Sequence, residues 1–212
     1  MKFVVLDTET TGLRAYYHEM VSFCGIKLDR DLREIDRIVV RIRPLHLNRA
    51  DSEALRINGY SPPRWADAMD PDEAAPLIAE FMRDCTPVAH NWAFDRGFIL
   101  ALFKATGRTD LRIMRRGIDT IALSIAAFGP YGLKSYSLES IGSMLGWPKQ
   151  KHRAEADTVM CYALFRLLYP MSIKTAIKIQ SIVLYAKIRG ILNPYRAMLA
   201  LLLSFWCQYV QP

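Results

Sequence analysis

The first 12 residues, MKFVVLDTETTG, constrain the fold more than any other part of this sequence. Residues 3–6 form a short apolar run, a pattern typical of a strand that is buried on both faces. Asp7 and Glu9 follow, and residues two apart on a strand project to the same side. We therefore predict that both carboxylates point to one place, just beyond the end of the strand.

Two carboxylates so close together have two interpretations. They repel each other and resist joint ionisation unless a cation lies between them, so Asp7 and Glu9 predict a metal site. The alternative is a strand that ends in a polar turn, with both acids solvated. The choice depends on whether other segments of the chain supply partners.

The composition favours a packed intracellular protein. Its 212 residues suit one domain of ordinary size plus an additional segment, and 51% hydrophobic with 23% charged residues excludes global disorder. The acids at positions 7 and 9 interrupt the N-terminal apolar run, which argues against a secretory signal. The cysteines lie far apart and predict reduced, mostly buried thiols in a reducing, cytoplasmic compartment: Cys24, Cys85, Cys161 and Cys207.

The net charge of +7 is unevenly distributed along the chain. Residues 171–212 contain five lysines and arginines and no acid, so residues 1–170 have a net charge of only +2. The basic composition is therefore weak evidence for a nucleic-acid groove in the main part of the chain.

The hydrophobic pattern predicts strands first and then strands alternating with helices. Residues 20–28 and 35–42 are rich in β-branched and aromatic residues and predict an antiparallel meander with the first strand. A short buried strand is expected at 87–91 and a strand end near 118, with Asp119 capping the helix that follows. Helices are predicted at 48–58, 61–65, 70–84, 92–106, 118–128, 137–145 and 154–169. This order indicates a mixed sheet flanked by helices.

Two later segments carry further acids. Asp95 lies in the first turn of the helix that follows a buried strand, and its alternative role is to complement the helix dipole. Asp157 lies about one turn into the last long helix, and His152 precedes that helix. Taken alone, this segment is better explained by a surface acid and a solvated histidine than by a site.

Together, the three segments resemble the DEDDh branch of the DnaQ-like 3′–5′ exonucleases, the group that contains the proofreading epsilon subunit of bacterial DNA polymerase III. The matching motifs are DTETTGL at 7–13, HNWAFD at 90–95 and HRAEAD at 152–157. In the sister DEDDy branch a tyrosine stands four residues before the last aspartate, where this chain has Arg153. The resemblance covers about residues 1–169 and includes all five signature residues in order.

The resemblance implies an α/β fold, a ribonuclease H-like mixed five-stranded sheet flanked by helices. We expect this exonuclease domain at residues 1–170, followed by a helical C-terminal extension at 171–212. The implied activity is hydrolysis of nucleic acid from its 3′ end, releasing nucleoside 5′-monophosphates. DNA with single-stranded or frayed ends is the preferred substrate, and RNA is the alternative. A non-catalytic nucleic-acid-binding module is the rival class, against which the five retained residues argue.

The resemblance also implies a role for each signature residue. Asp7 bridges two Mg²⁺ or Mn²⁺ ions, Glu9 and Asp157 hold the ion that carries the attacking water, and Asp95 supports the cluster. His152 is the implied general base, because an imidazole accepts a proton near neutral pH. Two divalent ions about 4 Å apart can activate water and stabilise the leaving oxygen, and such hard ions prefer carboxylate ligands.

Substrate contacts are expected beside these acids. The resemblance places the backbone of the turn after the first strand against the terminal nucleotide, and a leucine against its base. Phe94 has core packing as its alternative, and Asn91 has the capping of a turn. The expected contacts are Thr10, Thr11, Gly12, Leu13, Asn91 and Phe94.

Residues 171–212 fall outside the resemblance. Residues 197–210 are 14 residues without a charge, fewer than the roughly 20 apolar residues that a membrane-spanning helix needs. Packing on the exonuclease domain, a homodimer contact, peripheral association with a membrane surface and a polymerase contact all remain open for this extension.

Overall fold

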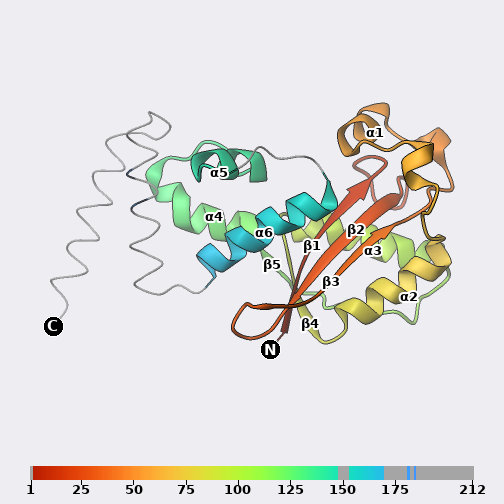
Figure 1. Ribbon diagram of the computed structural model, residues 1–212, viewed down its shortest axis with the longest axis horizontal. Helices are drawn as coiled ribbons and strands as arrows, with labels where there is room; N and C mark the ends of the chain where they lie inside the picture. The colour runs from red at the N-terminus through yellow and green to blue at the C-terminus, as the bar shows by residue number, and fades with distance from the viewer. Residues whose placement is uncertain (1, 148–152, 170–180, 182–183, 185–212) are drawn as a thin grey trace. The chain divides into compact units, whose positions relative to one another are not determined.

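The computed structural model of the chain describes residues 2–147, 153–169, 181 and 184 (Figure 1). The chain forms two compact units, which are described separately. Residues 1–119 and 151–163 form the first unit, and residues 120–150 and 164–212 form the second. His152 and nearly all of the predicted C-terminal extension lie outside the described residues.

The first unit contains a five-stranded mixed sheet, as predicted (Figure 1). Its strands lie in the order β3-β2-β1-β4-β5. The first three are antiparallel, whereas β4 and β5 continue the sheet in parallel with β1. The strands are β1 (Lys2–Thr10), β2 (Met20–Leu28), β3 (Glu34–Arg41), β4 (Cys85–Ala89) and β5 (Ile118–Asp119).

Strand β1 is longer than predicted. We expected Asp7 and Glu9 just beyond its end, but the strand continues to Thr10, and this expectation is wrong. The reason is pairing with β2, which places Asp7 opposite Cys24 and Glu9 opposite Ser22. The two acids therefore lie on one face of a regular strand, which fixes their direction more firmly than a turn would.

Two helices cover the opposite face of the sheet. Helices α2 (Pro71–Met82) and α3 (Trp92–Ala105) pack Ile78 and Phe98 into a buried cluster with Val4 and Leu6 of β1. Because side chains alternate along a strand, the acids at positions 7 and 9 project away from this core. They face the side where α6 (Ala154–Leu168) begins.

Short helical segments connect β3 to α2. They are η1 (Leu47–Arg49), α1 (Ser52–Asn58) and η2 (Pro62–Trp65). Gly59 ends α1 with a left-handed φ of 67°, a conformation that glycine adopts without strain. Ser61 precedes η2 at its N-cap position, with Pro62 in the first turn.

The second unit contains helices α4 (Thr120–Phe128) and α5 (Leu138–Met144), with η3 (Gly129–Tyr131) between them in sequence. The predicted start of α5 is confirmed, because the hydroxyl of Ser137 accepts a hydrogen bond from the Ser140 N–H. Within the part of the chain that the structure describes, no helix is long and apolar enough to cross a membrane.

Two smaller predictions concern Asp119 and the cysteines. Asp119 immediately precedes α4, at the position predicted for its cap, and its carboxylate also accepts hydrogen bonds from the N–H groups of Asn91 and Trp92, at the start of α3. The capping of α4 itself stays a prediction. The buried state of three cysteines is confirmed: Cys24, Cys85 and Cys161. Among the described residues, none of them forms a disulfide.

Candidate active site

Three acidic side chains converge above the face of the sheet that α6 approaches. Asp7 and Glu9 come from β1, and Asp157 comes from the first turn of α6. One carboxylate oxygen from each lies within 4.8 Å of the others. Residues 150 positions apart in the sequence therefore form one cluster, as the metal-site interpretation of the first strand requires.

Asp95 joins this cluster from α3. It is only 3% exposed, and its carboxylate accepts a 2.8 Å hydrogen bond from the hydroxyl of Thr8. Its charge raises the pKa of Asp7, which places the two carboxylates close together. Asp95 is thus more deeply buried than complementing a helix dipole requires, which favours a role in the acidic cluster.

Burial and mutual repulsion strongly disfavour the ionised form of these acids. Burial is the largest cause of the raised pKa of Asp7, followed by the charges of Asp95, Glu9 and Asp157. Burial, followed by the charges of Asp157 and Asp95, raises the pKa of Glu9 to about 7. Burial raises the pKa of Asp95 to about 7, although the hydrogen bond from Thr8 opposes the shift. The cluster therefore resists carrying its full negative charge at neutral pH.

The donor set fits divalent cations. Among the described residues, no lysine or arginine forms an ion pair with Asp7, Glu9 or Asp95. A bound cation would relieve both the repulsion and the cost of burial. Carboxylate oxygens without histidine or thiolate among the three closest groups suit Mg²⁺ or Mn²⁺ better than Zn²⁺.

The backbone that follows β1 is held by side chains from elsewhere in the fold. The Asn58 amide donates a 3.1 Å hydrogen bond to the carbonyl of Thr10, and Asn58 is only 3% exposed. The hydroxyl of Thr10 donates to the carbonyl of Gly12, and the Asp51 N–H donates to the carbonyl of Thr11. The predicted substrate-binding turn is therefore fixed in the absence of substrate.

The other predicted contact residues differ in their surroundings. Leu13 is 79% exposed at the end of the turn. Asn91 is exposed and has a left-handed φ of 84° immediately before α3. Phe94 is half-buried, with its ring centroid 4.9 Å from that of Phe98, so it packs partly on the core and keeps an exposed edge. Their contacts with substrate stay predictions.

Three residues that support the site were missed from the sequence: Thr8, Asn58 and Asp119. Thr8 points to the opposite face from Asp7, and strand alternation signals this direction but not its partner 87 residues away. Asp119 anchors the start of α3 and its charge helps to raise the pKa of Asp95. These partners follow from the tertiary fold alone.

A family model described as Exonuclease (RNase_T) matches residues 4–165. The match spans the sheet and all three acidic motifs. The chain belongs to this exonuclease family. The resemblance to DnaQ-like exonucleases expected from the motifs is therefore confirmed.

Curated relatives in this exonuclease family include components of DNA polymerase III. The chain is 32% identical over 177 residues to DNA polymerase III PolC-type of Thermotoga maritima, covering 82% of this chain and 12% of the relative. It is 28% identical over 166 residues to DNA polymerase III subunit epsilon of Treponema pallidum, covering 77% of this chain and 74% of that subunit. The chain thus spans only about an eighth of the PolC-type relatives that it matches.

Solved exonuclease structures share the fold. Escherichia coli Exonuclease I in complex with a dT13 oligonucleotide superposes with a TM-score of 0.69 at 19% identity, over 80% of this chain and 41% of that one. Exonuclease I of Methylocaldum szegediense gives a TM-score of 0.67 at 20% identity, over 82% and 42% of the two chains. The ribonuclease H-like fold predicted from the motifs is confirmed.

Proposed function

We propose that this chain is a metal-dependent 3′–5′ exonuclease that releases nucleoside 5′-monophosphates from the 3′ ends of DNA. The observation that carries the proposal is the convergence of Asp7, Glu9 and Asp157 within 4.8 Å of one another. Buried Asp95 lies beside them, and the whole arrangement falls inside the exonuclease family match. Bringing these anions together does not stabilise the fold, because like charges repel.

Each acid has a distinct proposed role. Asp7, whose pKa is raised by the charges of all three other acids, would bind both of two Mg²⁺ or Mn²⁺ ions, while Glu9 and Asp157 would hold one of them. Asp95, held by Thr8, would support the second. When bound, the two ions supply an activated water and charge stabilisation for the attacked phosphate and the leaving 3′ oxygen.

His152 is the proposed general base. It lies five residues before Asp157 in the sequence, in the HRAEAD motif. An imidazole has an ordinary pKa near 6.5, so its neutral form can accept the proton of the attacking water at neutral pH. Activity should consequently rise as pH increases through the pKa of His152 and level off above it, when the imidazole is fully neutral.

The turn after β1 is the proposed binding site of the terminal nucleotide. Backbone groups of Thr10, Thr11 and Gly12 would lie against its sugar, and exposed Leu13 would pack against its base. Asn91 and the exposed edge of Phe94 would contact the same nucleotide from α3. The hydrogen bonds that fix this turn support the proposal, because a preformed site loses less entropy on binding.

DNA is the preferred substrate because the relatives named above are DNA polymerase III proteins. The acids themselves do not distinguish the sugar, so RNA stays an arm of the test. We further propose that residues 1–170 form the exonuclease domain. Residues 171–212 would then form a separate segment for contact with a polymerase, a second copy of the chain or a membrane surface.

The proposal is tested by incubating 5′-labelled single-stranded DNA and RNA of equal sequence with the chain and Mg²⁺. We expect stepwise shortening of the DNA from its 3′ end, abolished by EDTA and by Asp157→Ala. Asp110→Ala is a matched control, because Asp110 is an exposed aspartate whose partner is Arg108. Shortening of RNA alone would reassign the substrate, and no metal-dependent shortening of either polymer would refute the enzymatic proposal.

A further inference from the structure

A cavity of about 390 Å³ lies in the first unit, and the proposed catalytic acids do not line it. Four segments far apart in the sequence form its walls: residues 16–20, residues 42–49, Pro71 and Asp72 at the start of α2, and residues 98–106. Aromatic and basic side chains line it together with aliphatic ones. We call it the aromatic–basic cavity, defined by Tyr16, Tyr17, His18, Arg49 and Lys104.

The two tyrosines carry cations over their rings. Arg14 lies with its guanidinium carbon 4.3 Å from the ring centroid of Tyr17, and Arg49 lies 5.9 Å from the same ring. The Lys104 ammonium lies 5.5 Å from the ring centroid of Tyr16. Tyr16 is 62% exposed and Tyr17 is 44% exposed. Large aromatic faces open to solvent beside cations are typical of surfaces that bind single-stranded nucleic acid.

The charges around the cavity leave a positive excess. Among the described residues, Arg14, Arg49 and Lys104 form no ion pair with an acid. The acid Glu19 is already engaged, because it accepts hydrogen bonds from the N–H groups of Leu45 and His46 and contacts the His46 ring.

Two further charged residues line the cavity wall. Arg43 is paired with Asp70 and adds no net charge. Asp72, in the first turn of α2, reduces the positive excess by one charge.

The loop that carries Tyr16 and Tyr17 is anchored next to the catalytic acids. At its base, the Thr11 N–H donates to the Glu19 carbonyl, and the Glu19 N–H donates to the Thr11 hydroxyl. The His18 ring packs so closely on Gly12 that a Cβ there would lie 2.6 Å from it. The cavity is therefore continuous in the fold with the turn proposed to hold the terminal nucleotide.

Helix α3 gives the direction and extent of the cavity. At about 1.5 Å per residue, Phe98 lies about 4.5 Å and Lys104 about 14 Å along the helix axis from Asp95. A stacked single strand advances about 3.4 Å per nucleotide, so this length accommodates about three nucleotides. The cavity thus begins close to the acids and leads away from them.

We propose that the aromatic–basic cavity binds the single-stranded segment on the 5′ side of the nucleotide being removed. Bases stack on Tyr16 and Tyr17, and phosphates contact Arg14, Arg49 and Lys104. This inference rests on the proposed exonuclease function and adds an extended site for substrate longer than one nucleotide. A partner protein with an acidic segment is the alternative occupant.

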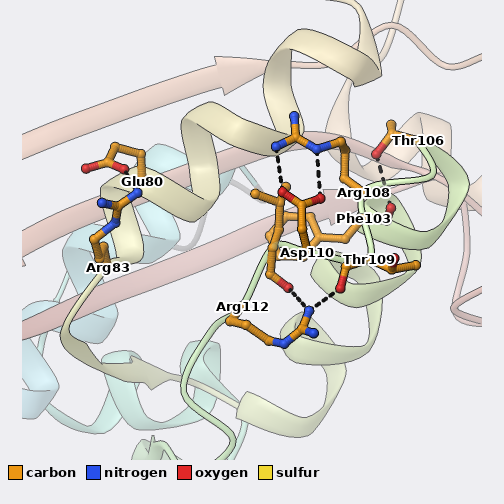
Figure 2. A network of polar contacts seen from close by, with 9 residues as sticks. Glu80, Arg83, Phe103, Thr106, Arg108, Thr109, Asp110 and Arg112 are labelled. Atoms are coloured by element: carbon orange, nitrogen blue, oxygen red, sulfur yellow. Dashed lines mark hydrogen bonds and ion pairs between the residues drawn. The ribbon is translucent and has the colours of Figure 1, made fainter.

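A second cavity, of about 720 Å³, is compared here as a surface to which we assign no nucleic-acid binding. Two of its three arginines are paired with acids: Arg83 with Glu80, and Arg108 with Asp110 through two 2.9 Å hydrogen bonds (Figure 2). The third, Arg112, donates to the backbone carbonyls of Thr109 and Leu111. Because Arg83 and Arg108 each have a carboxylate partner, they provide matched controls.

The experiment compares kinetics on two substrates for the full chain. One is a single-stranded DNA of about 12 nucleotides, and the other is the p-nitrophenyl ester of thymidine 5′-monophosphate, which is too short to reach the cavity. For the double variant Tyr16→Ala with Tyr17→Ala, we expect the ratio of kcat/KM on the DNA to kcat/KM on the ester to fall at least about tenfold. Tyr16→Phe with Tyr17→Phe keeps the rings and should restore most of that ratio.

The charge component is tested with Arg49→Ala plus Lys104→Ala against Arg83→Ala plus Arg108→Ala, which removes the same charge elsewhere. Anisotropy of the labelled DNA in EDTA measures binding without hydrolysis. Only the first pair should weaken binding, and it should lower the salt dependence of log K by about 0.7 for each lost phosphate contact.

Equal effects of the two charge pairs on DNA binding, or an unchanged substrate ratio in the tyrosine variant, would overturn the inference. An unchanged substrate ratio would favour a partner protein, and not single-stranded DNA, as the ligand of the aromatic–basic cavity. If the wild-type chain hydrolyses neither substrate, the proposed function fails, and the anisotropy result alone then decides for or against the cavity.

Discussion

The acidic cluster gathers buried groups of like charge, whereas the arginine network of Figure 2 contains exposed pairs of opposite charge. The network consists of Glu80, Arg83, Arg108, Asp110 and Arg112, which are paired with one another or with backbone carbonyls. Arg108 holds the pKa of Asp110 down to about 2. In the cluster, burial and like charges raise the pKa of Asp7 well above its usual range.

This difference distinguishes exposed ion pairs from a binding site. An exposed ion pair contributes little to stability, and its loss costs little, because solvent screens both charges. A group of buried anions without a cation destabilises the folded state, and such groups concentrate where a protein binds or transforms a ligand. On this comparison we propose that the acidic cluster binds a cation, because none of the described lysines and arginines forms an ion pair with Asp7, Glu9 or Asp95.

The largest expected effect follows from removing one charge of the cluster. Asp7→Asn keeps the size of the side chain but removes one of the three carboxylates that lie within 4.8 Å of one another. We expect hydrolysis of single-stranded DNA in Mg²⁺ to fall at least about 1,000-fold, since a bound metal contributes several kcal/mol to catalysis. Asp110→Asn, the same change in the arginine network, should keep near wild-type activity. Equal losses in both variants would remove the distinction between the two regions.

Thr8 provides a test of the support around the cluster. Thr8→Val keeps the shape of this buried side chain but removes the hydroxyl that donates to Asp95. We expect the affinity for Mn²⁺, measured by titration calorimetry, to fall about 10- to 100-fold, as for other changes to groups that orient metal ligands. Thr8→Ser keeps the hydroxyl and should bind Mn²⁺ nearly as tightly as wild type. A valine variant with wild-type affinity would show that the hydrogen bond plays no part.

The pH dependence of stability should reveal the strained cluster. Folding raises the pKa of Glu9 and of Asp95 to about 7, so the folded chain holds more protons than the unfolded chain between about pH 4.5 and pH 7. The free energy of unfolding of the metal-free protein should therefore decrease as pH rises through this window. Denaturant titrations at about pH 5 and about pH 8 measure this decrease.

Asp95→Asn identifies the source of that pH dependence. The amide oxygen still accepts the hydrogen bond from Thr8, but the group no longer ionises. We expect the variant to be more stable than wild type at about pH 8, in the absence of metal, by on the order of 2 kcal/mol. Saturating Mg²⁺ should reduce this difference in the free energy of unfolding, because it stabilises the wild-type protein. The same pH dependence in both proteins would mean that Asp95 titrates normally.

The smallest effect is expected in the arginine network. Arg108→Ala removes two hydrogen bonds to Asp110, but both side chains are exposed to water. We expect the Tm to change by less than about 2 °C in moderate salt. A much larger drop in a thermal melt would show that the network does stabilise the fold, and the comparison with the acidic cluster would then lose its basis.

The sequence predicts local features of this fold well. The strand at residues 20–28 has the predicted bounds, because its run of β-branched and aromatic residues is a local signal. The spacing of Asp7 and Glu9 predicts that they share a face, because alternation is a property of every strand. The three motifs predict the family from residue types in order, without any knowledge of distances.

Long-range pairing accounts for what the sequence did not predict. The extension of β1 to Thr10 depends on β2 as a partner, and the bond between Thr8 and Asp95 joins residues 87 positions apart. The aromatic–basic cavity is assembled from four separate segments, none of which has a recognisable motif. The prediction for His152 lies outside the described residues, and so does nearly all of the prediction for residues 171–212.

The most direct test of the central claim is a Mn²⁺ titration of the metal-free chain, followed by electron paramagnetic resonance. It measures cation binding without any assumption about the substrate. The account predicts two bound ions per chain near neutral pH, with binding lost in Asp7→Asn and retained in Asp110→Asn. Unchanged binding in Asp7→Asn would contradict the claim that this cluster is the metal site.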